Sequence, residues 1–337
     1  MYTLDSTTQT PMPSDPLRIA TTFEFEPGEI ARLKSAVPGR PVEIDVSRNE
    51  EEFRQSLACA EVIFGNCRGS DLACAPRVRW IQFSSAGIDG LDPELRDSPV
   101  LLTNYAGAFA PAIAETAFGL LLSLTRGLSR YYIPQFLRRE WKPVGTAKSP
   151  QYLEIAGRTM GVVGLGGIGR AVARTAAYGF QMRVIATDTR NGQRPEYVAE
   201  LHPPSWLDQL VRQADVVVAA APLTPETRQM FDERVFRSMK REAYFLALSR
   251  GQLFDDMALV KALRENWIAG AGLDVFPEEP PPPEHPIFDC PNVVMSMHTS
   301  GWGLGRQFRL IELFCENLRR YTSGQELLNI VNKNLGY

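Results

Sequence analysis

Short apolar runs alternate with amphipathic stretches along most of the 337-residue chain. An apolar run of strand length indicates a strand buried on both faces, whereas the stretches between the runs have the periodicity of helices. This alternation predicts parallel β-α units. In the first part of the chain, the expected strands are Leu17–Phe25, Val42–Val46, Val62–Gly65 and Val78–Phe83, and the expected helices are Glu29–Ala36 and Glu50–Ala60.

A long apolar helix, expected at Ala110–Arg130, separates this series from a second one. The second series contains the expected strands Thr159–Val163, Arg183–Thr187, Asp215–Ala220, Ala243–Leu248, Gly272–Val275 and Val293–Met297, and the expected helices Gly167–Tyr178, Pro225–Lys240 and Asp255–Asn266. We therefore expect an α/β protein with two Rossmann-like, doubly wound parallel-sheet domains. The length agrees, because single cores rarely grow beyond about 250 residues.

Composition narrows the possible environment and partners. The chain has 36 Lys plus Arg against 39 Asp plus Glu, a net charge of −3, so it offers no basic field to nucleic acid or to an anionic membrane. The most apolar segment, Ala117–Leu124, is too short to cross a bilayer, and Met1–Asp15 lacks the pattern of a secretory signal. The five cysteines show no C-x-x-C spacing, which favours free thiols over a metal site. We expect a soluble, cytoplasmic protein that binds no metal.

The segment GLGGIG, residues 164–169, satisfies the G-x-G-x-x-G pattern. It lies between an expected strand and an expected helix, as a dinucleotide-binding turn requires. Gly164 permits the tight turn, Gly166 lets the backbone approach a pyrophosphate, and Gly169 lets the helix pack against the sheet. With Gly167 and Ile168, these residues form the expected phosphate site at the helix N-terminus.

Asp188 follows the next expected strand, 19 residues after Gly169. A carboxylate at this place accepts hydrogen bonds from the ribose hydroxyls of NAD and repels the 2′-phosphate of NADP. Arg190 lies two residues further on and could soften that exclusion. The sequence therefore favours NAD and leaves NADP open.

The chain contains three histidines: His202, His285 and His298. His202 precedes two prolines and His285 lies in a proline-rich segment, so both are expected to be solvent-exposed loop residues. His298 instead follows the expected strand Val293–Met297. Because ligands of open parallel sheets bind beyond the carboxyl ends of the strands, His298 is the candidate proton donor.

Arg250 and Glu279 also lie beyond the ends of expected strands. Reduction of a 2-keto acid needs a cation that orients the carboxylate and polarises the carbonyl, and Arg250 can bind both. It also needs a proton donor, His298, and a carboxylate that orients its imidazole, Glu279. Each residue alone could form a structural salt bridge or cap a helix, but their joint placement favours hydride transfer.

Five ordered segments resemble the D-isomer-specific 2-hydroxyacid dehydrogenase family. They are GRTMGVVGLGGIGRAVA, ADVVVAAAPLTPETRQMF, LSRGQLFDDMALVKAL, AGAGLDVFPEEPPPPEHPIF and NVVMSMHTSG. The resemblance implies hydride transfer between NAD(H) and a small 2-keto acid or D-2-hydroxy acid, with glyoxylate or hydroxypyruvate as the default substrate. It implies Arg250, Glu279 and His298 as the catalytic trio, and Asp274 as a contact of the nicotinamide carboxamide.

The resemblance also implies a domain arrangement and a partner. Residues 1–108 and 300–337 would form a discontinuous, flavodoxin-like substrate-binding domain, and residues 109–299 the inserted NAD-binding Rossmann domain. The segment Arg139–Lys142, around Trp141, resembles an arm that relatives use to form a homodimer.

Further ligand contacts follow from the same resemblance. Additional cofactor contacts are expected from Pro222, Leu248, Ser249, Ser300 and Gly301. In the segment SSAGID, residues 84–89, Ser85 and the backbone N–H groups near Ala86 and Gly87 would bind the substrate carboxylate.

Three positions depart from the family pattern. Ala247 stands where relatives usually have Asn, Met297 where they usually have Pro, and Trp302 where a small residue is common. Trp302 could shape the substrate pocket or pack between domains. Two other functions stay open: an NAD(H)-sensing, corepressor-like interaction protein, and oxidation of formate or phosphite on the same scaffold. The complete trio favours a 2-hydroxyacid dehydrogenase, because a sensor needs no proton donor.

Overall fold

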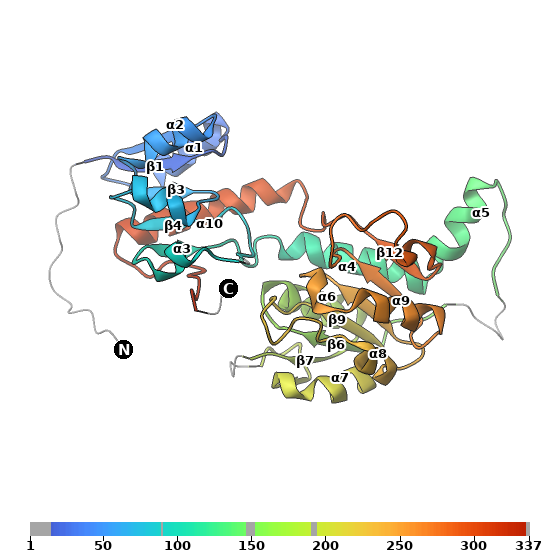
Figure 1. The fold of residues 1–337 in the computed structure, drawn as a ribbon. Helices are drawn as coiled ribbons and strands as arrows, with labels where there is room; N and C mark the ends of the chain where they lie inside the picture. Colours follow the sequence, from blue (N-terminus) through green and yellow to red (C-terminus); the bar gives the residue numbers. More distant parts are fainter. Residues whose placement is uncertain (1–14, 89, 146–151, 190–193, 335–337) are drawn as a thin grey trace. The chain divides into compact units, whose positions relative to one another are not determined.

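The computed structural model describes residues 15–88, 90–145, 152–189 and 194–334 (Figure 1). The chain divides into two compact units, one formed by residues 1–105 and 307–337 and the other by residues 106–306. The first unit therefore combines both ends of the chain, and the second is continuous in sequence. The boundaries expected from the sequence lay after residues 108 and 299. Most of the segment Met1–Asp15, in which no secretory signal was expected, lies outside the described residues.

The first unit contains a five-stranded sheet with the order β2-β1-β3-β4-β5, in which every pairing is parallel. Its strands are β1 (Leu17–Thr21), β2 (Val42–Val46), β3 (Val62–Phe64), β4 (Trp80–Gln82) and β5 (Leu101–Thr103). Its helices are α1 (Pro27–Ser35), α2 (Glu50–Leu57), η1 (Gly69–Cys74), α3 (Pro93–Asp97) and most of α10 (Gly305–Thr322). This strand order is that of flavodoxin-like folds.

Helix α10 belongs to the first unit because polar groups fix it there. Asn317 of α10 is fully buried, and its amide nitrogen donates to Gln82 of β4 at 3.1 Å and to the carbonyl of Leu328 at 3.1 Å. Its amide oxygen accepts from the Leu328 N–H at 2.7 Å. A buried amide with all these bonds satisfied specifies one position of the helix on the sheet. This helix was not expected from the sequence.

The second unit contains a seven-stranded parallel sheet with the order β12-β11-β10-β9-β6-β7-β8. Its strands are β6 (Thr159–Val163), β7 (Arg183–Thr187), β8 (Glu200–His202), β9 (Val216–Ala219), β10 (Tyr244–Ala247), β11 (Gly270–Leu273) and β12 (Val293–Met295). Its helices are α4 (Ala110–Thr125), η2 (Leu128–Tyr132), α5 (Ile133–Leu137), α6 (Gly167–Phe180), η3 (Pro204–Trp206), α7 (Leu207–Gln213), α8 (Glu233–Ser238), η4 (Gly251–Leu253), α9 (Asp256–Arg264) and η5 (Pro286–Asp289). The order is that of a Rossmann sheet extended by one strand, and the connections change direction between β6 and β9.

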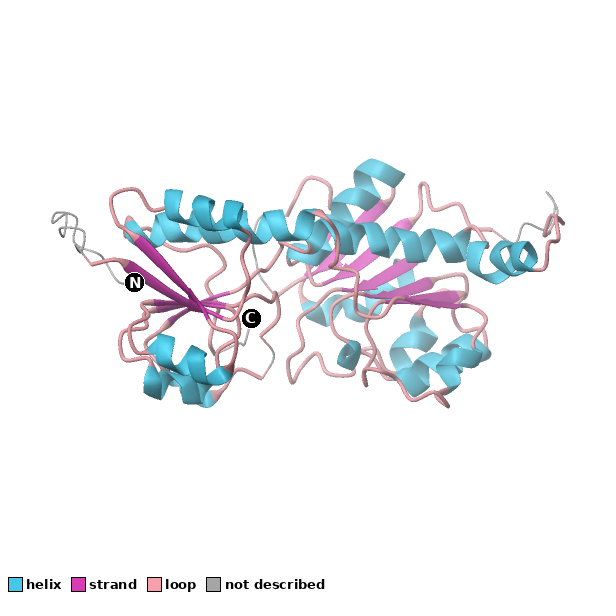
Figure 2. Cartoon of the chain, turned by 90° about the horizontal axis from the view of Figure 1, so that it is seen from above, coloured by secondary structure: helices cyan, strands magenta, loops and turns pink. Residues whose placement is uncertain are grey.

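Each sheet carries helices on both faces, as Figure 2 shows. In the second unit this produces two apolar cores. One core packs α4 and α6 against the sheet, and the other packs α7, α8 and α9 against it. Strand β9 supplies both cores from alternate side chains, Val216 and Val218 to one and Val217 and Ala219 to the other. The expected α/β class with two Rossmann-like sheets is confirmed.

Two expected helices are shorter than their apolar patterns. The helix expected at Ala110–Arg130 ends at Thr125 because Gly127 adopts the left-handed conformation, with φ of +69°. A π-helical turn follows it. Within Pro225–Lys240 only Glu233–Ser238 is helical, and it begins where the Asp232 carboxylate accepts from the Val235 N–H at 2.8 Å.

Two expectations about histidines were wrong. His202 is not in a loop but ends β8, where its Nε2 contacts Glu200 at 2.9 Å and its ring stacks on Trp206. The side chain of His285 is only 11% exposed. Its Nε2 lies 3.1 Å from Asp256, and its Nδ1 accepts from the Ile287 N–H. Both side chains have structural partners, which neighbouring prolines do not reveal in the sequence.

No helix in the described part of the chain is both long enough and apolar enough to cross a membrane.

Candidate active site

The glycine-rich turn lies where β6 ends, beside the point at which the strand order reverses. Gly164 has φ of +93°, and a Cβ there would lie 2.6 Å from the backbone of Ala221. A Cβ on Gly169 would lie 1.9 Å from the carbonyl oxygen of Gly164. Only glycine fits at either place. Gly166 caps the N-terminus of α6, which begins at Gly167, so the first N–H groups of this helix face the end of the sheet.

This turn and its neighbours fit a dinucleotide. Ile168 lies in the first turn of α6, and a Cβ on Gly167 would lie 2.7 Å from Gly107, so the chain closes tightly around the turn. The Asp188 carboxylate, half-buried after β7, accepts from the Leu165 N–H at 2.7 Å. That bond holds the carboxylate next to the turn, where a ribose would lie. Arg190 lies outside the described residues.

Three further residues that were expected to contact the cofactor border the same edge of the sheet. The carbonyl of Pro222 accepts from the Thr227 hydroxyl at 2.7 Å. The Ser249 hydroxyl donates to the carbonyl of Ala221 at 2.8 Å, which ties the end of β10 to the end of β9. Leu248 is buried in the core, so only its backbone is available to a ligand.

His298 and Glu279 form the central pair of the site. The Nδ1 atom of His298 lies 2.7 Å from Oε2 of Glu279. The other carboxylate oxygen of Glu279 accepts from the Phe276 N–H at 2.8 Å, which fixes its orientation. Both side chains are partly exposed, and Nε2 of His298 has no hydrogen-bond partner among the described residues. A ring held through one nitrogen presents the other to a ligand.

The backbone at His298 is unusual and is held by Asp274. His298 lies three residues beyond β12 in the left-handed region, with φ of +52°, and its N–H donates to the carbonyl of Asp274 at 2.8 Å. The Asp274 side chain is 3% exposed. It accepts from the Ser296 hydroxyl at 2.8 Å, from the N–H groups of Thr299 and Ser300, both at 3.1 Å, and from the Ser300 hydroxyl. Asp274 therefore positions the turn that carries His298, a role that its place in the sequence did not reveal.

Arg250 is placed by a close approach of two loops. A Cβ on Gly251 would lie 1.9 Å from the backbone of Phe276, so glycine is required directly after Arg250. Gln252 extends the contact by donating to the carbonyl of Pro277 at 2.9 Å. The Arg250 guanidinium donates to the carbonyl of Ser249 at 2.7 Å. The turn of Arg250 thus packs against the segment that leads to Glu279.

The last expected residues of this unit follow His298. Ser300 is buried by its bonds to Asp274, and a Cβ on Gly301 would lie 3.3 Å from Phe109. Trp302 is 68% exposed, and Met297 is 78% exposed. The two large apolar departures from the family pattern therefore stand at the surface on either side of His298 and Ser300.

The expected carboxylate loop lies in the other unit, after β4. The Ser85 hydroxyl donates to the carbonyl of Gly87 at 2.7 Å, and the Asn104 amide donates to the carbonyl of Ala86 at 2.9 Å. The amide N–H groups of Ala86 and Gly87 have no acceptor in the described ranges. Two neighbouring amides of this kind can bind an anion. Asp89, the last residue of the motif, lies outside the described residues.

Residues 118–300 match the family model "D-isomer specific 2-hydroxyacid dehydrogenase, NAD binding domain". The chain belongs to this family. A glyoxylate reductase of Korarchaeum cryptofilum is 36% identical over 263 residues, which are 77% of each chain. A glyoxylate reductase of Pyrococcus horikoshii is 37% identical over 266 residues, 77% of this chain and 78% of the relative.

A solved structure extends the similarity to nearly the whole chain. The NADPH-dependent glyoxylate/hydroxypyruvate reductase of Sinorhizobium meliloti, in complex with NADP and sulfate, superposes with a TM-score of 0.77 at 26% identity. The match covers 96% of this chain and 100% of that one. The expected family is therefore confirmed, and the protein is an NAD(P)-dependent oxidoreductase.

Proposed function

We propose that the protein reduces small 2-keto acids to D-2-hydroxy acids with NADH, and that glyoxylate and hydroxypyruvate are its default substrates. The observation that carries this proposal is the pair formed by His298 and Glu279, 2.7 Å apart, with Nε2 of the histidine available. The relatives that are named glyoxylate reductase support the substrate class.

His298 is the acid–base residue in this proposal. When bound, the nicotinamide supplies the hydride that adds to the carbonyl carbon. Nε2 of His298 donates a proton to the carbonyl oxygen, so that the ketone becomes a secondary alcohol, or an aldehyde such as glyoxylate a primary one. Glu279 holds Nδ1 and keeps Nε2 pointed at the reacting oxygen. Assistance of this kind contributes about 10²–10⁴-fold to the rate.

Arg250 and the loop after β4 recognise the substrate anion. The Arg250 guanidinium binds the carboxylate and polarises the carbonyl oxygen, because its fork of donors suits both. In the other unit, the amides of Ala86 and Gly87 are available to bind a substrate carboxylate, with Ser85 holding their loop. Local donors are needed because the net charge of −3 provides no general attraction for an acid. Trp302, exposed four residues after His298, is the candidate residue for contact with the substrate side chain.

Asp188 supports NADH as the preferred cofactor. Its carboxylate is fixed by Leu165, so it can accept from both ribose hydroxyls but repels a 2′-phosphate. NADPH stays a second cofactor, since the relative from Sinorhizobium meliloti was solved with NADP. The nicotinamide side of the proposed cofactor site is bordered by residues at the ends of the strands and in the turn after His298: Asp274, Pro222, Leu248, Ser249, Ser300 and Gly301.

The test is the loss of NADH absorbance with glyoxylate, hydroxypyruvate, pyruvate and phenylpyruvate, repeated with NADPH. We expect turnover that is lost in Arg250→Ala. If NADH binds tightly and no keto acid oxidises either cofactor, the dehydrogenase assignment fails and the NAD(H)-sensing alternative replaces it. The relatives named above give that alternative no support.

A homodimer is the proposed assembly. Figure 1 shows α5 extending from the end of α4, away from the sheet. Helix α5 and the residues that follow it form an arm that exposes large apolar side chains: Phe136 is 78% exposed, Leu137 74% and Trp141 98%. Contiguous exposed apolar groups of this size mark an interface, and a second copy of the chain is the occupant that the family resemblance implies. Light scattering should show a dimer that Phe136→Ser weakens and Met257→Ser, an exposed apolar residue on α9, leaves intact.

The five cysteines are free, which supports a reducing compartment, and we propose the cytoplasm.

A further inference from the structure

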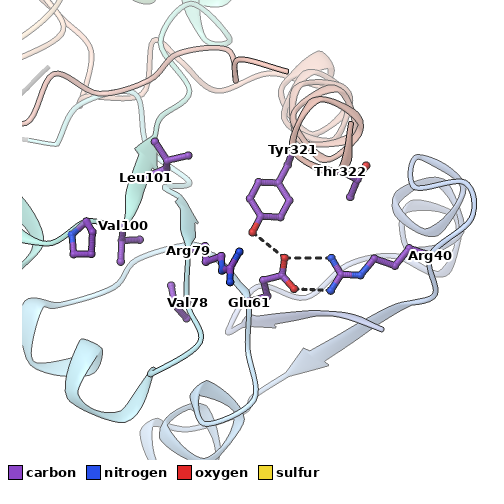
Figure 3. Close-up of a pocket in the computed structure, with 9 residues that line it drawn as sticks. Arg40, Glu61, Val78, Arg79, Val100, Leu101, Tyr321 and Thr322 are labelled. Atoms are coloured by element: carbon purple, nitrogen blue, oxygen red, sulfur yellow. Dashed lines mark hydrogen bonds and ion pairs between the residues drawn. The ribbon is translucent and has the colours of Figure 1, made fainter. Parts of the chain in front are cut away.

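A cavity of about 500 Å³ opens at the amino edge of the five-stranded sheet. Its lining comes from residues that precede β3, β4 and β5, among them Glu61 and Arg79, and from Tyr321 at the end of α10 (Figure 3). The volume lies within the range of small-molecule sites. Arg79 precedes β4 and the Ser85 loop follows it, so this cavity and that loop lie at opposite ends of one strand.

One wall of the cavity is an ion pair between Arg40 and Glu61 in which both carboxylate oxygens already accept hydrogen bonds. The side chain of Arg40 is 6% exposed and its guanidinium donates to both oxygens of Glu61, at 3.2 and 2.5 Å. The Tyr321 hydroxyl donates to Glu61 at 2.8 Å, and Nε of Arg40 donates to the carbonyl of Asp15 at 2.9 Å. The negative charge of Glu61 is therefore already neutralised before any ligand arrives.

Arg79 is a second cation beside the cavity, and its side chain is bonded differently from that of Arg40. Its backbone is held on both sides, because its N–H donates to the carbonyl of Glu61 at 3.0 Å and its carbonyl accepts from Leu101 at 2.9 Å. Its guanidinium makes no hydrogen bond or ion pair with any residue that the structure describes. Two guanidiniums face one carboxylate here, so the cavity has one positive charge in excess.

The remaining lining is apolar. Val78 and Val100 form buried parts of it, and Leu101 is 42% exposed although it begins a strand. The ring of Tyr321 packs on buried Trp80 with centroids 5.4 Å apart, which gives the cavity a rigid aromatic side. A ligand that fills this space needs an apolar body next to a single negative charge.

We propose that this cavity binds a small organic monoanion, a carboxylic acid with an apolar body, whose carboxylate pairs with Arg79 and whose body packs on Val100, Leu101 and Tyr321. This would be a second acid-binding site of the chain, separate from the catalytic groups. Arg–carboxylate pairing is bidentate and directional, which suits a side chain whose backbone is held on both sides, as that of Arg79 is. A carboxylate is preferred to phosphate because the one excess positive charge can neutralise only one of the two charges of a dianion, and the apolar wall supplies no further partner.

The test is calorimetric titration of the full chain with phenylacetate, with its neutral isostere phenylacetamide and with inorganic phosphate. We expect saturable binding of phenylacetate, and binding of the other two that is weaker by about tenfold or more. Equal binding of phenylacetamide would overturn the proposal, because the charge would then play no part. Stronger binding of phosphate would overturn the choice of ligand.

Matched variants locate the binding. Arg79→Gln should weaken phenylacetate by about tenfold, whereas Arg77→Gln, an exposed arginine two residues away that does not line the cavity, should not. Arg250→Gln should keep the binding, because the catalytic site is then disabled and this cavity is not. Binding that survives Arg79→Gln and disappears in Arg250→Gln would show that the acid occupies the catalytic site, and would refute the second site. These outcomes do not depend on whether the chain turns over a keto acid.

Discussion

Replacing Asp274 by alanine tests how the His298 turn is held. The variant removes a carboxylate that is 3% exposed and leaves the N–H groups of Thr299 and Ser300 without their acceptor. A buried donor that loses its partner costs about 1–3 kcal/mol. Two such donors, one of them in a half-buried residue, predict a loss of about 2–4 kcal/mol in the free energy of unfolding.

The same change should also disorder the catalytic histidine. The left-handed backbone of His298 costs about 1–2 kcal/mol, and the bonds from Thr299 and Ser300 to the Asp274 side chain, which the variant removes, help to keep it in place. We therefore expect kcat to fall by about tenfold or more, because reacting groups that are slightly misplaced lose much of their effect.

Chemical denaturation and steady-state kinetics measure the two effects, and Asp215→Ala is the matched control. Asp215 accepts from the Thr159 N–H and from Lys240, both at 2.8 Å, but it precedes β9 and so lies at the opposite edge of the sheet from His298. It should lose stability and keep kcat. The reasoning is refuted if Asp274→Ala keeps both its stability and its kcat, or if Asp215→Ala loses as much kcat as Asp274→Ala.

Three further variants test other parts of the structure. Gly164→Ala places a Cβ 2.6 Å from the backbone of Ala221 at φ of +93°, so it should cost about 2 kcal/mol or more in thermal unfolding and abolish NADH binding measured by fluorescence. Asp188→Ala should raise the KM for NADH about tenfold and bring it closer to the KM for NADPH. An unchanged ratio of the two KM values would contradict the role of this carboxylate. Burial alone would raise the pKa of Glu61, but hydrogen bonds from Arg40 and Tyr321 hold that pKa below its ordinary value. Its ionised form therefore stabilises the fold at neutral pH and loses this effect as the pH falls through the lowered pKa, so denaturation should show that Glu61→Gln costs more stability at neutral pH than below about pH 4.

The sequence predicted ten of the twelve strands and the groups that the second unit brings together, but it did not predict β5, β8 or α7. Its strand and glycine patterns are local, and local patterns determine where a strand ends and a helix begins. The roles of Asp274 and Gly251 were not predictable, because each depends on the distance between loops that are far apart in the chain. Helix α10 was missed although it is strongly amphipathic. The amphipathic pattern of Gly305–Thr322 was the signal that could have revealed it.

The structural roles of two histidines were missed for a similar reason. His285 was expected in solvent because prolines surround it, but its partner Asp256 is 29 residues away. His202 pairs with Glu200 on its own strand, a spacing that gives no contact signal unless the strand is recognised. Burial of a polar side chain thus depends on tertiary partners, which a single sequence does not show.

The most direct test of the account compares the wild type with His298→Gln and Glu279→Gln in NADH oxidation by glyoxylate, with NADH binding followed separately. We expect kcat to fall by about 10²-fold or more without His298 and by about tenfold without the Glu279 carboxylate, while the affinity for NADH is retained. Full activity of His298→Gln would contradict the assignment of the proton donor.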